Sequence, residues 1–332
     1  MNKNGLNTNP MNIQFSHCLI QKSKNFEYEN NYAVFKSIND ILLLIFQNEM
    51  YSIIIFDIVD NRTINSIKNA HKNQINNIRH HLDKRNKRDL VISLSFDNLK
   101  VWNINNLECL FELKIFGIDT KFNYSCFLQD NENINIIIKK FSLEVYDLVG
   151  NQIKIINDSD INTYSIETYY DNISSKIYII TGNKNIVNSY DYYENKIYKK
   201  FEDNDINNKY FLYFYSIVVN ERKGLIELIA SCEDGNLRIW NFASGLLIKK
   251  IKVSDYKIIS ICLYNNEYIL VGTLDYAIKL IQINNFEIIK ELKNDESIIS
   301  IKRINHPKYG ESFISEDTDG NIKIWTSSFI LY

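Results

Sequence analysis

Three residues of the chain, His71, Ser93 and Asp97, are the residue types of a serine hydrolase. In such enzymes an imidazole takes the proton of a serine hydroxyl, and a carboxylate holds the imidazole in the required tautomer. Residue types alone do not show whether the serine faces a substrate. The elements that position the three side chains therefore decide between a catalytic role and a structural one.

The histidines and cysteines form no recognisable metal-binding motif. A zinc site needs three or four converging ligands, and the five His and five Cys are scattered along the chain. His80 and His81 are adjacent, so on a β-strand they point to opposite faces. With only 10 Gly, no glycine-rich phosphate loop precedes a helix. We expect no catalytic residue, no metal and no cofactor, and free cysteines in a reducing compartment.

An aromatic or apolar residue followed by a small or polar one recurs seven times at the ends of short β-rich runs. The second members of the pairs lie 46, 44, 44, 50, 41 and 44 residues apart. One four-stranded propeller blade needs about 40–45 residues, so this period predicts seven blades. The pairs are Phe56-Asp57, Trp102-Asn103, Tyr146-Asp147, Tyr190-Asp191, Trp240-Asn241, Ile281-Gln282 and Trp325-Thr326.

We predict an all-β fold in which residues 12–332 form a single seven-bladed β-propeller of four-stranded antiparallel blades. Short apolar runs divided by Asn, Asp, Gly and Lys support this prediction, with only two Pro in the chain. Residues 1–11 are expected to be a flexible N-terminus. The predicted blades are 32–67, 74–113, 121–156, 162–201, 210–251, 257–292 and 297–332.

The seventh blade lacks a complete fourth strand, because only residues 326–332 follow Trp325. Residues 12–20 are strand-like and precede the first blade without a partner. We predict that they supply the outer strand of the seventh blade, because an unclosed ring leaves unpaired backbone edges. An independent N-terminal strand or loop is the alternative.

These residues resemble the WD-repeat β-propeller family over roughly residues 32–326. In that family a His, a Ser, an Asp and a Trp often pin a blade, and the second blade matches best. The matching residues are His71, Ser93, Asp97 and Trp102 in the second blade, Asp234 and Trp240 in the fifth, Asp275 in the sixth, and Ser315, Asp319 and Trp325 in the seventh. The resemblance implies that they form a buried polar network without an exposed nucleophile.

The resemblance also implies a function. We expect a non-catalytic scaffold for protein–protein interactions within a multiprotein complex of a eukaryotic cell. One or more proteins or peptides would be its partners, and we predict no self-association. Fold alone does not fix function, so this expectation rests on the family.

Two charged segments are candidates for contact with a partner. The segment 79–88 is expected to be a basic loop between the first two strands of the second blade, and a positive loop attracts acidic partners. The alternative function is therefore a nucleic-acid- or phospholipid-associated propeller. The second segment, 202–205, is acidic and could meet a basic peptide. The candidates are Arg79, Lys84, Arg85, Lys87, Arg88, Glu202, Asp203 and Asp205. Solvated surface charge is the alternative for both segments.

The overall composition favours an intracellular protein, cytoplasmic or nuclear, rather than a secreted one. The formal net charge is −2, whereas nucleic-acid binders usually carry a basic balance, so we do not expect a nucleic-acid partner. The N-terminus has no basic start followed by an apolar core, so we expect no signal peptide. No apolar run approaches the ~20 residues of a membrane span.

Overall fold

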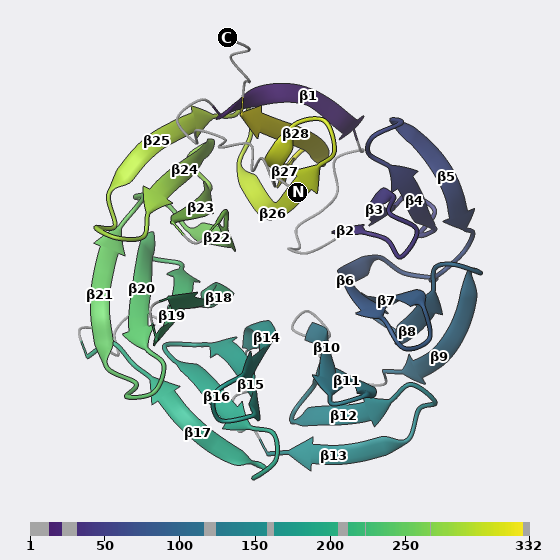
Figure 1. Cartoon of the computed structure of the whole chain (residues 1–332), viewed down its shortest axis with the longest axis horizontal. Helices are drawn as coiled ribbons and strands as arrows, with labels where there is room; N and C mark the ends of the chain where they lie inside the picture. The colour runs from purple at the N-terminus through teal and green to yellow at the C-terminus, as the bar shows by residue number, and fades with distance from the viewer. Residues whose placement is uncertain are drawn as a thin grey trace, which may run out of the picture.

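The protein is a ring of seven four-stranded antiparallel sheets (Figure 1). The computed structural model describes residues 13–21, 32–115, 124–157, 163–204, 212–222, 224–265 and 267–327, and within these ranges it contains no helix. The predicted seven-bladed, all-β propeller is therefore confirmed. The predicted flexible segment 1–11 lies outside the described residues.

Each blade contains four consecutive strands, which we call first to fourth from the central channel outwards, except that β1 is the fourth strand of blade seven. Blade one consists of β2 Tyr32–Lys36, β3 Leu42–Gln47, β4 Ile53–Asp57 and β5 Arg62–Ile67. Blade two consists of β6 Ile75–Asp83, β7 Arg88–Ser95, β8 Asn98–Asn103 and β9 Glu108–Lys114. Blade three consists of β10 Tyr124–Asp130, β11 Asn133–Lys139, β12 Leu143–Asp147 and β13 Gln152–Ile156. Blades four and five consist of β14 Thr163–Asp171, β15 Lys176–Asn183, β16 Val187–Asp191 and β17 Lys196–Phe201; and β18 Phe214–Arg222, β19 Leu225–Cys232, β20 Asn236–Asn241 and β21 Leu247–Lys252. Blades six and seven consist of β22 Ile258–Leu263, β23 Tyr268–Thr273, β24 Ala277–Gln282 and β25 Ile288–Lys293; and β26 Ile298–His306, β27 Gly310–Asp317, β28 Asn321–Ser327 and β1 Ile13–Gln21.

The first strand of blade five starts later than residue 210, where the sequence predicts that this blade begins. It is β18, which starts at Phe214 and pairs with β19 from Cys232 back to Leu225. The tight turn at Gly224, with φ of +77°, fixes the hairpin and so carries the strand on to Arg222. Phe214 is buried, as a core residue should be, and residues 205–211 lie outside the described part of the chain.

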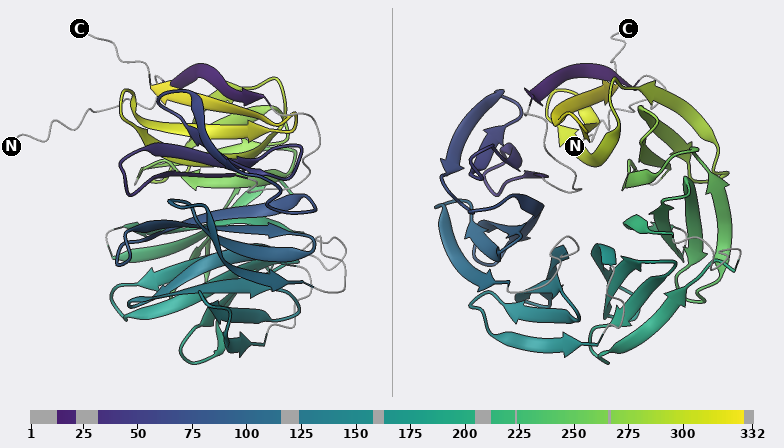
Figure 2. Two further views of the ribbon diagram at one scale, coloured as in Figure 1. Left: turned by 90° about the vertical axis from the view of Figure 1, so that its right-hand side faces the viewer. Right: turned by 180° about the vertical axis from the view of Figure 1, so that it is seen from behind.

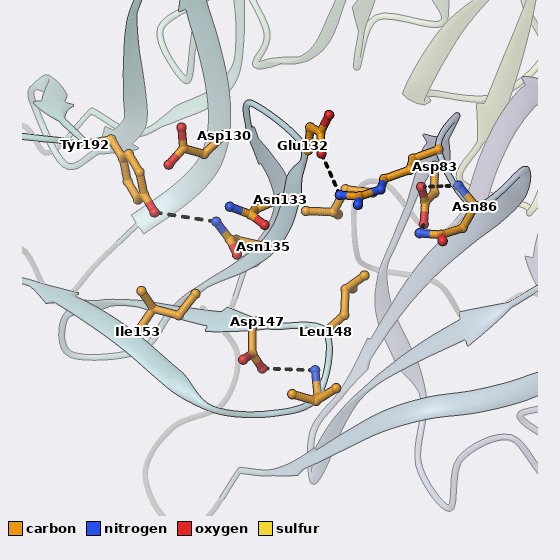
Figure 3. A pocket seen from close by; sticks show the side chains of 13 residues that line it. Asp83, Asn86, Asp130, Glu132, Asn133, Asn135, Asp147, Leu148, Ile153 and Tyr192 are labelled. Atoms are coloured by element: carbon orange, nitrogen blue, oxygen red, sulfur yellow. Dashed lines mark hydrogen bonds and ion pairs between the residues drawn. The ribbon is translucent and has the colours of Figure 1, made fainter.

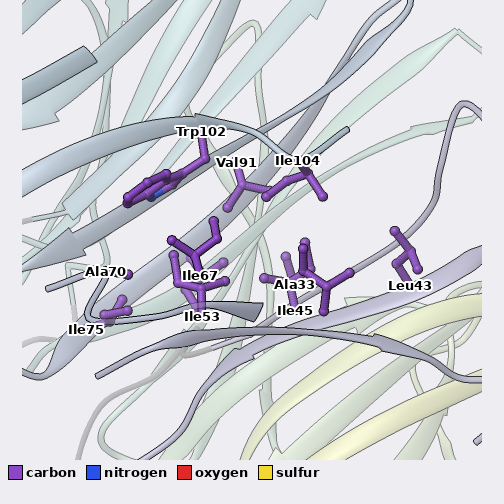
Figure 4. Close-up of a cluster of buried hydrophobic side chains, with 12 residues drawn as sticks. Ala33, Leu43, Ile45, Ile53, Ile67, Ala70, Ile75, Val91, Trp102 and Ile104 are labelled. Atoms are coloured by element: carbon purple, nitrogen blue, oxygen red, sulfur yellow. The ribbon is translucent and has the colours of Figure 1, made fainter. Parts of the chain in front are cut away.

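Apolar residues fill the space between neighbouring blades. Seven clusters of buried hydrophobic side chains are present among the described residues, one for each adjacent pair of blades around the ring. Figure 4 shows the cluster between blades one and two, in which Ile45 and Ile53 of β3 and β4 lie near Val91 and Trp102 of β7 and β8. Because successive strand residues point to opposite faces, each sheet serves two such clusters.

The ring is closed by the strand from the N-terminal side, as predicted. β1 pairs antiparallel with β28, from Ile13 opposite Ser327 to Gln21 opposite Asn321. The ring of Phe15 lies 5.7 Å from that of Trp325 in an edge-to-face arrangement. On the other side, the Lys290 ammonium donates a hydrogen bond to the Ile13 carbonyl at 2.8 Å and so links blade six to this strand. The alternative of an independent N-terminal strand is excluded.

The strands run between two faces of the ring, which the side view in Figure 2 separates. The connector face carries the turns between second and third strands and the connections from one blade to the next. The hairpin face carries the turns between first and second strands and between third and fourth strands. This division follows from the antiparallel order of the four strands in every sheet.

Candidate functional site

The hydrolase-like residues of blade two form a buried network on the connector-face side of the blade. The Trp102 indole donates a hydrogen bond to Ser93 Oγ at 2.8 Å, and His71 Nε2 lies 2.6 Å from the same oxygen. The other ring nitrogen, His71 Nδ1, lies 2.5 Å from Asn98 Oδ1 and 2.9 Å from Ser95 Oγ. The structure thus brings His71, Ser93 and Trp102 together, as the sequence predicts.

Asp97 joins this network only indirectly, because the Ser95 hydroxyl donates to its carboxylate at 2.7 Å. Burial lowers the pKa of His71 to about 4, so the imidazole is neutral at pH 7. Ser93 is completely buried, and its oxygen already serves the indole and the imidazole. This arrangement locks strands together and offers no accessible nucleophile.

The other blades use the predicted residues differently. In blade seven Trp325 donates to Ser315 Oγ at 2.8 Å, which repeats the bond of blade two. In blade five the Trp240 indole donates instead to the Glu202 carbonyl at 2.9 Å. Asp275 of blade six accepts hydrogen bonds from Thr273, from Ser254 at 2.9 Å and from Lys279 at 3.0 Å.

In blade seven a second carboxylate, that of Asp317, helps to hold the turn that contains the predicted Asp319. Asp317 is buried, accepts hydrogen bonds from Asn321 and pairs with Lys323 at 3.3 Å. Asp319 lies half-buried in the turn that follows β27. Asp317 can reach Lys323 because Ser315 lies opposite Lys323 and Asp317 is on the same side of the sheet as Ser315.

Sequence analysis missed a recurring cation on the third strand. A Lys or Arg precedes Trp102, Trp240, Ile281 and Trp325 by two residues, and each reaches the connection that enters its blade. Lys100 donates to the Ala70 carbonyl at 2.9 Å, Arg238 binds Asp203, Lys279 donates to the Val253 carbonyl at 2.9 Å, and Lys323 donates to Asn294 at 2.8 Å. The spacing Lys/Arg-x-Trp was the available signal.

The acidic segment 202–205 does not present its central carboxylate to a partner, contrary to the prediction. Asp203 is buried, and it binds the fully buried Arg238 at 2.9 Å and Lys250 at 2.9 Å. Arg238 also holds Asp234 with two bonds of 3.0 and 2.7 Å. Glu202 is exposed, and Asp205 lies outside the described residues.

The basic segment 79–88 is not a loop, contrary to the prediction. It is a hairpin: β6 runs to Asp83, Lys84–Lys87 turn, and β7 starts at Arg88. Arg79 reaches Glu167 of blade four at 2.8 Å, and Arg88 binds the buried Asp83 at 2.8 Å. His80 stacks on Phe35 of blade one whereas His81 packs against Phe127 of blade three, so the two histidines point to opposite faces as expected.

Lys84, Arg85 and Lys87 remain exposed at the tip of this hairpin. Arg85 forms an exposed ion pair of 2.6 Å with Glu132, at the corresponding tip of blade three. The positive charge expected of the segment is therefore shared largely with carboxylates of the protein itself.

The aspartates of three of the seven repeated pairs shape turns on the hairpin face. Asp57, Asp147 and Asp191 each accept hydrogen bonds from backbone N–H groups two or more residues ahead. Such Asx turns fix the connection between third and fourth strands. In blade three the turn also needs Gly150, whose φ is +95° and whose missing Cβ would lie 2.7 Å from the Phe111 ring of blade two.

A groove of about 610 Å³ crosses the hairpin face at blade three (Figure 3). One side is formed by Asp83, Arg85 and Asn86 of blade two, and Tyr192 of blade four lies at the opposite end. The apolar part of its wall comes from Ile134, Leu148, Val149 and Ile153.

Carboxylates outnumber cations in the wall of this groove. Asp83, Asp130, Glu132 and Asp147 line it, against the single guanidinium of Arg85. Although burial acts to raise it, hydrogen bonds from Asn86 and Arg88 hold the pKa of Asp83 below its usual range. Hydrogen bonds from Asn151 and the turn backbone lower the pKa of Asp147 in the same way. Both groups are therefore ionised at neutral pH.

Leu148 departs from a pattern that the other described turns share. The residue after the repeated polar position is apolar and buried in five blades, as Ile58, Ile104, Tyr192, Phe242 and Ile283. Leu148 has the same place in blade three but is only half-buried, and it faces the groove. A core position is thus left partly uncovered at this one turn.

The neighbouring blades expose further apolar side chains on the same face. Val149 is 77% exposed, Ile173 of blade four 83% and Leu246 of blade five 70%. They occupy the turns Asp147–Asn151, Asn172–Ser175 and Asn241–Leu246 of three consecutive blades. Of the three, Val149 also lines the groove, and exposed apolar groups at a groove are typical of binding surfaces.

In the described part of the chain, no group of three or more His, Cys, Asp or Glu side chains is placed to hold a metal ion. A helix with the length and apolar character needed to cross a membrane is likewise absent from these residues. A scan against models of known protein families and a search of curated proteins both find no match to the sequence. The architecture alone therefore establishes a seven-bladed β-propeller, a fold that commonly mediates protein interactions.

Proposed function

We propose that this protein is a non-catalytic, WD-repeat-type scaffold that binds other proteins through its hairpin face, within a multiprotein assembly inside the cell. The observation that carries the proposal is a set of exposed apolar side chains in hairpin-face turns of adjacent blades, Val149, Ile173 and Leu246, of which Val149 lines the groove. A rigid ring holds these turns in fixed positions, and the turns themselves can vary without loss of the fold.

The burial of the hydrolase-like residues supports the non-catalytic part of the proposal. A serine nucleophile needs a free hydroxyl next to a substrate, whereas Ser93 is enclosed and its oxygen is occupied by Trp102 and His71. The network of blade two is also the best support for the WD-repeat resemblance, because it uses three of the four side chains of that family.

Affinity capture of the tagged full chain from its native cells, followed by mass spectrometry, tests the proposal. We expect one or a few proteins that are retained at raised salt, because apolar contacts persist when charges are screened. A triple variant with Val149, Ile173 and Leu246 changed to Ser should lose them, whereas the matched variant with the equally exposed Met50 of the connector face changed to Ser should keep them. Capture of nothing specific, or equal capture by the triple variant, would contradict the proposal.

A further inference from the structure

The groove at blade three combines an uncovered apolar floor with a wall of carboxylates. This combination restricts the chemistry of an occupant more than the exposed apolar turns do. The inference that follows rests on the proposed function, because it assigns one partner class to one part of the hairpin face.

We propose that the groove binds an extended segment of a partner protein in which a large apolar side chain lies next to a Lys or Arg. The apolar side chain packs on Leu148, Val149 and Ile153. The cation lies against the carboxylates of Asp130, Glu132 and Asp147.

The need for an apolar side chain follows from Leu148. In five other turns the chain covers the equivalent residue with its own side chains, and in blade three it does not. Covering apolar surface is favourable by about 25 cal/mol per Å². The turn cannot close over Leu148 by itself, because Gly150 rests on the Phe111 ring and Asp147 Oδ1 already fixes Val149 and Asn151.

The need for an organic cation follows from the arrangement of the acids. They are spread along the wall from the tip of β10 to the turn after β12, and they do not form a group able to hold a metal ion in the described part of the chain. Several carboxylates around a groove several ångströms across suit the dispersed charge and multiple donors of a Lys or Arg side chain.

The effect of Arg85 on binding affinity has a direction that can be measured. It pairs with Glu132 at the mouth of the groove, and both side chains are exposed. Exposed ion pairs contribute little to stability, so a cation from the partner can replace Arg85. Removing Arg85 should then strengthen binding, since the groove becomes more negative. A partner attracted by the basic hairpin tip, such as a nucleic acid or an anionic membrane, would instead bind more weakly.

The probe is a phage-displayed random peptide library selected on the full-length protein. Isolates should carry a Lys or Arg close to a large apolar residue. In fluorescence-polarisation titrations, the variant Asp130→Asn with Glu132→Gln should bind about tenfold more weakly, and Val149→Ser about fivefold more weakly. Arg85→Ala should bind about two- to fivefold more tightly at low salt, an advantage that shrinks as salt is added.

Matched controls separate the groove from the rest of the face. Val59→Ser removes an exposed apolar residue at the corresponding turn of blade one, and Asp60→Asn removes an exposed carboxylate from the same turn. Both should leave affinity unchanged. Leu148→Ser is added only if its thermal unfolding matches wild type, because Leu148 is partly buried. Val149→Ser keeps the test valid in either case.

The proposal is overturned if no isolate is recovered, if isolates are acidic, if the groove variants bind them as wild type does, or if Arg85→Ala weakens binding. Affinity capture with the Asp130→Asn, Glu132→Gln variant separates this failure from that of the proposed function. Equal capture of specific proteins by wild type and variant would leave the scaffold function in place and reject the groove. Capture of nothing by either would reject both.

Discussion

Arg238 on the connector face and Arg85 on the hairpin face use their charge in opposite ways. On the connector face, Arg238 is fully buried between Asp203 and Asp234. On the hairpin face, Arg85 and Glu132 form a pair that is open to solvent. A buried pair depends on both partners because neither can recover its hydration, whereas an exposed pair is nearly neutral in free energy. The Arg238 pairs therefore stabilise the ring, whereas the Arg85–Glu132 pair beside the groove can be exchanged for a contact with a partner.

Removing Arg238 should be the most damaging single change that tests this contrast. Arg238→Ala leaves the buried Asp203 and its neighbour Asp234 without their guanidinium, and we expect a loss of about 3–5 kcal/mol in the free energy of unfolding. Urea unfolding followed by tryptophan fluorescence measures it. The matched change Arg85→Ala should alter stability by less than about 1 kcal/mol. Equal losses for the two variants would abolish the distinction between the two arginines.

The second test concerns the neutral imidazole on the connector-face side of blade two. The pKa of His71 is about 4 in the folded protein and about 6.5 in an unfolded chain. Between pH 6.5 and pH 4, His71 is therefore protonated in the unfolded chain and neutral in the folded chain. The stability linked to His71 is present above that pH and falls away towards pH 4, by about 3 kcal/mol in total.

His71→Gln removes this titration but keeps a polar side chain. We expect the variant to be less stable than wild type at pH 7, and the difference to shrink by up to about 3 kcal/mol as the pH falls to about 4. Unfolding free energies measured at several pH values give the two curves. Parallel curves for wild type and variant would show that the imidazole is not held neutral.

Substitution of Gly150 tests whether the turn beside the groove has a fixed backbone conformation. Gly150→Ala forces a side chain into positive φ and against the Phe111 ring, and should cost about 2–3 kcal/mol. Gly224 has φ of +77° but nothing within 4 Å of its missing Cβ, so Gly224→Ala should cost only about 1 kcal/mol. The difference in unfolding free energy isolates the contact with Phe111. No difference would mean that the turn beside the groove is loosely packed.

The smallest effect is expected at the tip of the blade-two hairpin. Changing both Lys84 and Lys87 to Ser should leave stability within about 0.5 kcal/mol of wild type, because both side chains are exposed and outside the groove wall. Binding to RNA or to vesicles of anionic lipid should not depend on them. Salt-dependent binding that disappears in this variant would favour the nucleic-acid or phospholipid alternative. Arg88 is left unchanged because it neutralises the buried Asp83.

The fold was predictable because each blade repeats one local pattern. The pairs from Phe56-Asp57 to Trp325-Thr326 recur with the period of a blade, and the polar members in blades one, three and four make the turns that require them. Pairing of the N-terminal strand with the last blade followed from counting strands. The first inference depends only on residues that are close in sequence. The second depends only on the fourth strand that the last blade lacks.

The charged surface was less predictable because its partners are distant in sequence. From the sequence alone, Asp203 is predicted to be a surface acid. In the structure it binds Arg238, which lies 35 residues later in the chain. From the sequence alone, the segment 79–88 is predicted to be a basic loop. In the structure Glu167 binds Arg79 and Glu132 binds Arg85. The groove had no sequence signal, because Leu148 has the same chemistry as Ile58 or Ile104 and only the packing around it differs.

Closure by β1 has a consequence for biosynthesis. The first of the described strands to leave the ribosome pairs with the last of them, and Ile13 meets Ser327 only after the strands of the seven blades that lie between them have been made. During translation β1 remains an apolar strand without a partner, the kind of segment that chaperones hold. A nascent chain that stops early cannot form a smaller ring, because every truncation before β28 removes the strand to which β1 must bind.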